Sequence, residues 1–129
     1  LVSGGQHGDE RKALDEIMTK LRTLTQDTGI VLFAVSHLKR PEGKGHEEGA
    51  ATSVAQLRGS ASIAQLSDFV IGLERNGQSE DPTERNTTYI RVLKNRFSGI
   101  TGPAGALLYD NDTGRLTEYE PIQEAEDAL

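Results

Sequence analysis

Apolar residues recur at three- and four-residue steps in the first quarter of the chain. The stripe that they would form on a helix consists of Leu14, Ile17, Met18, Leu21 and Leu24. Acidic residues at positions 9 and 10 suit the positive end of a helix dipole, and Gly29 is a plausible stop. The pattern therefore predicts an amphipathic helix over residues 9–28.

The segment that follows this glycine is apolar at every position. Residues 30–35 read Ile-Val-Leu-Phe-Ala-Val, which is too short for a helix of ordinary length. A strand buried on both faces, as in a parallel sheet under helices, explains such a run. A helix, one glycine and a buried strand in succession are typical of an α/β fold.

The remaining elements are shorter. We expect, in order, a loop over residues 38–52, a short helix over 54–66, a second buried strand over 69–73, a turn-rich stretch over 75–86, a strand over 87–95, and a terminal β-hairpin formed by 106–109 and 115–117. The acidic segment after Pro121 has little to bury, so we expect it to be disordered.

Composition narrows the class of protein. The chain has 129 residues, 35% hydrophobic and 26% charged, which fits one soluble domain or part of one. No apolar run approaches the roughly 18 residues that a membrane span needs. Cysteine is absent, which excludes disulfides and thiolate zinc sites and fits an intracellular protein. Because the chain begins at Leu1 without a methionine or a signal-type segment, we interpret it as the interior of a longer reading frame.

The net charge of −6 does not exclude nucleic acid as a partner. Five acidic residues lie in the last twelve positions, so residues 1–117 carry 15 acidic against 14 basic residues. A nearly neutral body of this kind can still present a local basic loop.

Two segments after the first predicted strand are candidate ligand sites. His37 follows the carboxyl end of that strand, where α/β sheets bind ligands, and its imidazole can hydrogen-bond a phosphate. The loop that follows carries Lys39, Arg40, Lys44 and His46, which together can wrap a phosphate backbone. The alternative for His37 is a capping or solvated residue. The alternative for the loop is a solvated segment, because three glutamates dilute its positive charge.

Two further segments carry cations. Arg58 stands beside a glycine and a serine before an expected helix start, with Gln65 about two turns further on, which suits an anion site. Lys94 and Arg96 are two residues apart in a strand and should share a face that invites a polyphosphate. The alternatives are ordinary helix capping and a solvated edge strand. The sequence G-x-x-x-x-G-K-[ST] is absent, and Gly43-Lys44-Gly45 lacks both the hydroxyl residue and the leading strand of a phosphate loop.

Taken in order, six short motifs resemble hexameric replicative helicases of the DnaB type, most closely the phage primase–helicases and the Twinkle-like mitochondrial helicases. The motifs are Val-Ser-His-Leu-Lys-Arg-Pro (35–41), His-Glu-Glu-Gly (46–49), Leu-Arg-Gly-Ser (57–60), Gln-Leu-Ser-Asp (65–68), Leu-Glu-Arg-Asn (73–76) and Leu-Lys-Asn-Arg-Phe-Ser-Gly (93–99). The resemblance covers roughly residues 9–118. It implies a partial RecA-like α/β domain, a sheet flanked by helices with a C-terminal β-hairpin, from a homo-hexameric ring around single-stranded DNA.

The resemblance also implies a role for each candidate residue. His37 corresponds to the sensor of the γ-phosphate, and the DNA-contacting loop would contain Lys39, Arg40 and Lys44. Arg58 and Gln65 correspond to the motif that couples nucleotide state to DNA. Arg96 corresponds to the arginine finger and Lys94 to its companion, both reaching the nucleotide of the neighbouring subunit. The residues that would sandwich the base of a bound nucleotide are Arg75 and Tyr109.

The same resemblance implies cofactors, partners and limits. The full-length protein would use ATP or dTTP with Mg²⁺, whereas residues 1–129 alone lack the phosphate loop and should not hydrolyse nucleotide. We expect residues 1–118 to form the motor portion, and 119–129 to form an acidic tail that contacts a replisome protein. We expect no membrane partner and a cytoplasmic location in a bacterial or phage-infected cell. A RecA-type recombinase, a regulatory ATPase and a non-catalytic module that binds DNA or protein remain alternatives.

Overall fold

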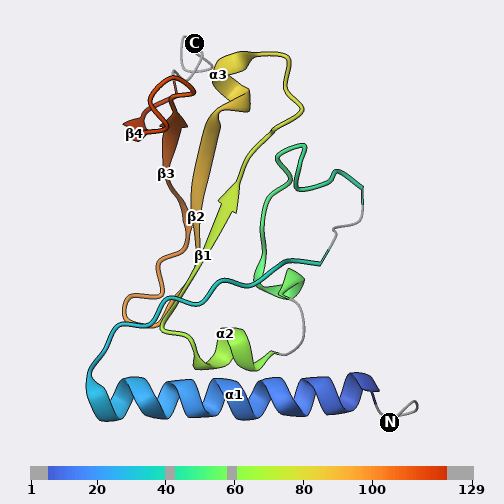
Figure 1. Ribbon diagram of the computed structural model, residues 1–129, viewed down its shortest axis with the longest axis vertical. Helices are drawn as coiled ribbons and strands as arrows, with labels where there is room; N and C mark the ends of the chain where they lie inside the picture. The colour runs from blue at the N-terminus through green and yellow to red at the C-terminus, as the bar shows by residue number, and fades with distance from the viewer. Residues whose placement is uncertain (1–5, 40–42, 58–60, 122–129) are drawn as a thin grey trace.

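The computed structural model describes residues 6–39, 43–57 and 61–121. The long helix α1 (Gln6–Thr28) lies across one end of the molecule (Figure 1). Gly29 ends it with a φ of 70°, and its N–H donates to the carbonyl of Thr25 at 2.9 Å. A positive φ of this kind favours glycine because it has no Cβ. The predicted helix and its stop are both confirmed.

Four strands form one sheet. They are β1 (Phe69–Glu74), β2 (Thr87–Asn95), β3 (Gly102–Tyr109) and β4 (Leu116–Tyr119). They lie in the order β1-β2-β3-β4, and each pair of neighbours is antiparallel. The α/β class and the terminal hairpin of β3 and β4 are therefore confirmed.

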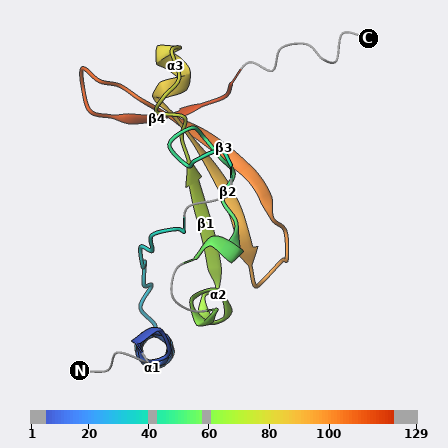
Figure 2. The ribbon, with the colours of Figure 1, turned by 90° about the vertical axis from the view of Figure 1, so that its right-hand side faces the viewer.

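The remaining helices are short. They are η1, one 3₁₀ turn (Val54–Gln56), α2 (Ser62–Leu66) and α3 (Pro82–Arg85). The prediction of one helix over residues 54–66 is wrong, because the backbone is already extended at Leu57 after the 3₁₀ turn. α2 lies against α1 (Figures 1 and 2). No helix in the described ranges combines the length and the apolarity that crossing a membrane requires.

The predicted strand over residues 30–35 is also wrong for this structure. The segment is unpaired, and Val31, Phe33 and Val35 expose 81%, 89% and 96% of their surface. A run that is apolar at every position gains stability as a strand only between two neighbouring strands and under a covering layer. Here the segment leaves α1 as an open connection (Figure 2), and none of the described strands pairs with it.

The strand β1 was predicted correctly, but it is not buried on both faces. Phe69, Ile71 and Leu73 alternate along it and are 51%, 55% and 64% exposed. The ring of Phe69 lies 5.5 Å from that of Phe97, centroid to centroid, on the same open side. Among the residues that the structure describes, Ala106 is the one hydrophobic side chain that is buried. An apolar sheet face of this extent is typical of a surface that another layer covers.

Candidate functional site

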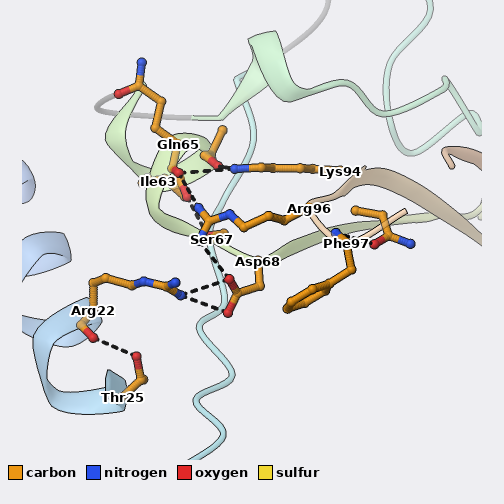
Figure 3. Close-up of polar contacts among 11 residues, drawn as sticks. Arg22, Thr25, Ile63, Gln65, Ser67, Asp68, Lys94, Arg96 and Phe97 are labelled. Carbon is orange, nitrogen blue, oxygen red and sulfur yellow. Dashed lines mark hydrogen bonds and ion pairs between the residues drawn. The ribbon is translucent and has the colours of Figure 1, made fainter. Parts of the chain in front are cut away.

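The two cations of the 93–99 motif converge on the carboxyl end of α2 (Figure 3). Lys94 Nζ donates to the carbonyl oxygens of Ala64 and Gln65 at 2.6 and 3.2 Å. Arg96 Nη2 donates to the same carbonyl of Gln65 at 2.8 Å. These carbonyls have no partner within so short a helix, so the two cations satisfy them. The prediction placed both cations in one strand, but β2 ends at Asn95 and Arg96 follows it. The two side chains nevertheless reach the same carbonyl, that of Gln65.

A carboxylate that sequence reasoning left without a role joins the same cluster. Arg22 of α1 donates from Nη1 to both oxygens of Asp68 at 2.9 Å, and Arg96 Nη1 donates to Oδ1 at 2.8 Å. The hydrogen bond from Arg22 and the positive charges of Arg22, Arg96 and Lys94 lower the pKa of Asp68, against the effect of burial. Three cations surround one anion here, so the cluster keeps a surplus of positive charge.

A β-bulge explains why these cations face α2. Val70 pairs with Lys94, but the next residue, Ile71, pairs with Val92, which leaves Leu93 without a partner in the ladder between β1 and β2. Directly paired residues point to the same side of a sheet, so Lys94 shares the side of Val70. An extra residue in one strand re-aims the side chains beyond it. The bulge therefore turns Lys94, and Arg96 after it, toward α2.

The predicted base-binding pair lies at the opposite end of the sheet. Arg75 Nε donates to the carbonyl of Arg85 at 2.6 Å, and the N–H of Tyr109 donates to the carbonyl of Asn86 at 2.9 Å. Adjacent residues at the end of α3 thus anchor both members of the pair. Tyr109 exposes 39% of its surface, which leaves ring surface accessible. β2 runs between this end and the Lys94–Arg96 cluster over nine residues, a span of about 30 Å.

A second polar cluster fixes the segment that leads into η1. Glu74 is 7% exposed and accepts hydrogen bonds from the N–H and Oγ1 of Thr52, both at 2.8 Å. Arg91 donates to it from Nε at 2.8 Å and from Nη2 at 3.2 Å. Gly72 leaves room for Thr52, because a Cβ at this position would lie 1.9 Å from Thr52 Oγ1. Sequence reasoning missed this cluster, and its one signal was an acidic residue at the end of an apolar strand.

The predicted DNA-contacting and coupling residues are only partly placed. His37 and Lys44 are exposed. The N–H of Lys39 donates to the carbonyl of Gln56 at 2.7 Å, which ties the start of the loop to η1. Lys39 and Gln65 line one open cleft of about 880 Å³ between α1, η1 and α2. Arg40 and Arg58 lie outside the described residues.

The described carboxylates and imidazoles do not form a metal-binding group of three. The cations of the site suit phosphate, whereas a magnesium ion needs carboxylate or hydroxyl oxygen ligands.

Comparison with known proteins agrees with the order of motifs. A family model described as the DnaB-like helicase C-terminal domain matches residues 1–118. The chain is 50% identical over 117 residues to a DNA helicase/primase of Enterobacteria phage T3. That match covers 90% of the chain and 20% of the relative, so the chain spans about one fifth of the relative's length.

Proposed function

The chain belongs to the DnaB-like helicase C-terminal domain family, and on that premise we propose that it is the C-terminal portion of a motor domain that couples nucleotide hydrolysis to movement along DNA. The motor portion would comprise residues 1–118, and residues 119–129 would form an acidic tail for a replisome partner. The full-length protein would act in the cytoplasm of a bacterial or phage-infected cell. It would be a homo-hexamer that translocates on single-stranded DNA and unwinds duplex with ATP or dTTP and Mg²⁺.

One observation carries this proposal: the two sets of predicted nucleotide contacts lie at opposite ends of β2. Arg75 and Tyr109 are anchored beside α3, whereas Lys94 and Arg96 are anchored beside α2. The separation of about 30 Å along the strand is longer than a nucleoside triphosphate. One chain cannot bring both sets to the same nucleotide. The arrangement suits a ring in which one end holds the chain's own nucleotide and the other end reaches a neighbour's.

The chemistry at the second end suits a transferring phosphoryl group. An arginine there neutralises the negative charge that develops on the phosphate oxygens as water attacks. Lys94 is held beside it and adds a second positive charge. Since a neighbouring subunit would supply both, hydrolysis would depend on the geometry of the ring. His37 would sense the γ-phosphate from a different part of the fold.

The DNA side of the mechanism rests on the loop after His37. We propose that Lys39, Arg40 and Lys44 contact the phosphates of single-stranded DNA. Arg58 and Gln65 would pass the nucleotide state to that loop. The bond from Lys39 to Gln56 and the shared cleft of Lys39 and Gln65 support a link between the two segments.

The test is Arg96→Ala in the full-length protein. We expect nucleotide hydrolysis to fall by about 10³-fold or more, as for arginine fingers supplied by a partner. Arg96→Lys should rescue poorly, because lysine lacks the planar fork that meets two phosphate oxygens. Arg115→Ala, in the turn of the β3–β4 hairpin, is the matched control. Residues 1–129 alone, which lack a phosphate loop, should give the background rate.

A mixing experiment separates a finger that acts on a neighbour from one that acts on its own subunit. Arg96→Ala subunits are combined with subunits whose phosphate-loop lysine is replaced. Some interfaces in a mixed ring then pair an intact loop with an intact finger, and hydrolysis should partly recover. Near-normal hydrolysis by rings of Arg96→Ala subunits alone would refute the assignment.

A further inference from the structure

We propose that Asp68 is a positioning residue that holds the guanidinium of Arg96 in a resting place on its own subunit, and that Arg22 of α1 sets how tightly it holds. This inference rests on the proposed role of Arg96. It concerns a carboxylate and a helix that the motor chemistry described above does not use.

The resting place is defined by two anchors. Arg96 Nη1 donates to Asp68 Oδ1 at 2.8 Å, and Nη2 donates to the carbonyl of Gln65 at 2.8 Å. Both terminal nitrogens of the guanidinium are therefore engaged (Figure 3). An arginine binds phosphate most strongly when it presents two parallel N–H groups to two oxygens. In this position both terminal nitrogens already donate within the subunit, so Arg96 can turn its full set of N–H groups to a neighbour's nucleotide only after it leaves Asp68.

The backbone bond next to the side chain stays in place during such a movement. The N–H of Arg96 donates to the carbonyl of Asp68 at 2.9 Å, which holds the end of β2 against the start of β1. Only the side chain needs to swing. The movement is then a change of rotamer in an exposed side chain and leaves the sheet intact.

Arg22 lowers the free-energy cost of separating Arg96 from Asp68. It donates to both oxygens of Asp68, so the carboxylate remains paired when Arg96 leaves. Lys94 likewise still donates to the carbonyl of Gln65. The side chains of Arg96 and Asp68 are 35% and 37% exposed, and ion pairs at this exposure are weak. A phosphate that offers paired, charge-assisted hydrogen bonds outcompetes them.

The same geometry makes α1 a regulator of the finger. Arg22 and Arg96 share the charge of one carboxylate, so each weakens the hold of Asp68 on the other. A shift of α1 that withdraws Arg22 would leave Asp68 to Arg96 alone and would retain the finger. A position of α1 that keeps Arg22 on both oxygens of Asp68, as in this structure, weakens the hold on Arg96. Removal of Asp68 and removal of Arg22 should therefore have opposite effects on hydrolysis.

The experiment measures kcat and KM for nucleotide hydrolysis without DNA in the full-length protein. Asp68→Asn should raise kcat about two- to fivefold, the factor by which an exposed ion pair shifts an equilibrium. Arg22→Gln should lower kcat by a similar factor. KM should change in neither variant, because neither residue touches the chain's own nucleotide. Glu84→Gln, which neutralises a carboxylate at the far end of the sheet, is the matched control.

A double variant tests whether the effect passes through the finger. Asp68→Asn combined with Arg96→Ala should show no gain over Arg96→Ala alone. A merely structural ion pair predicts that Asp68→Asn and Arg22→Gln both lower activity, and that result would overturn the inference. If Asp68→Asn fails to fold, Arg22→Gln is measured with and without Arg96→Ala. The inference predicts that Arg22→Gln lowers kcat only where Arg96 is present, and an equal loss in the Arg96→Ala background contradicts it. Full activity of Arg96→Ala would instead contradict the proposed function.

Discussion

Replacement of the buried carboxylate of Glu74 by an amide tests the packing of the segment before η1. Glu74→Gln keeps the shape of the side chain but removes the charge that Arg91 and Thr52 contact. Glutamine retains a single oxygen for the donors that meet Oε1 and Oε2. Its NH₂ group then faces an N–H or a guanidinium donor, so at least one buried donor loses its acceptor.

The expected cost follows from the burial of the two partners. Removing one partner of a fully buried ion pair destabilises a protein by about 3–5 kcal/mol. Glu74 is 7% exposed, but the side chain of Arg91 is 31% exposed, so water can solvate the guanidinium that is left behind. We therefore expect a local loss of about 2 kcal/mol, within the range for hydrogen bonds to a charged group. That corresponds to about a 30-fold change in the opening equilibrium.

Hydrogen exchange reads this loss directly, because the N–H of Thr52 donates to Glu74 at 2.8 Å. Exchange at Thr52 should accelerate about 30-fold in Glu74→Gln, with little change in β3. Glu84→Gln is the control, since Glu84 accepts a hydrogen bond from Tyr89 but lies outside the cluster. Equal exchange at Thr52 in the two variants would show that the Glu74 network does not hold this segment.

Protection of the Thr52 N–H from exchange should depend on the ionisation of Glu74. Burial alone would raise the pKa of Glu74, but hydrogen bonds from Arg91 and Thr52 outweigh it and bring the pKa below its usual value of 4.5. A carboxyl whose folded pKa is lowered stabilises the fold at pH values above its unfolded pKa. Protection at Thr52, corrected for the intrinsic exchange rate, should be constant near neutral pH and should decline as the pH falls below 4.5.

Two further substitutions test the close approach of Thr52 to Gly72 and the proposed base-binding role of Tyr109. Gly72→Ala would place a Cβ 1.9 Å from Thr52 Oγ1, so we expect the local stability to fall by about 1–3 kcal/mol from overpacking. Faster hydrogen exchange at Thr52 measures this loss, and unchanged exchange would contradict the packing described. Tyr109→Ala in the full-length protein should raise KM for nucleotide about tenfold, as expected when one stacking contact is lost, while kcat is retained and Tyr109→Phe behaves as the parent. A fall in kcat with an unchanged KM would remove Tyr109 from the base site.

Local patterns predicted the elements whose stability is local. The apolar stripe of α1 and the strand-forming residues of β2 led to nearly correct bounds, and Gly29 marked the end of the helix. The prediction of a strand over residues 30–35 was wrong, because an apolar run shows that the residues favour a buried strand but not that a partner strand is present. The composition of residues 69–73 was enough to predict the strand β1. Its antiparallel pairing depends on β2, which the local pattern does not contain.

The site was predictable only in part, for a related reason. The motifs identified Lys94 and Arg96, and their two-residue spacing predicted a shared face. Asp68 and Arg22 are 46 positions apart, and Glu74 and Arg91 are 17 apart. Their pairing depends on the register of β1 with β2 and on the position of α1, which no local pattern contains. The hydrogen-bond partners that organise the cluster therefore became visible only in three dimensions.

The bulge at Leu93 determines which face of the sheet carries Lys94. In a regular ladder that paired Val70 with Leu93, Lys94 would pair with Phe69 and would point to the apolar face, away from α2. A shift of one residue in the pairing beyond Val92 would thus exchange a charged face for an apolar one. The turns at residues 75–86 and 110–115 carry no such constraint on side, because a change of length there leaves the strand register intact. Changes of length should accordingly be tolerated in those turns, whereas a change in the register between β1 and β2 should disrupt the contacts of Lys94 with α2.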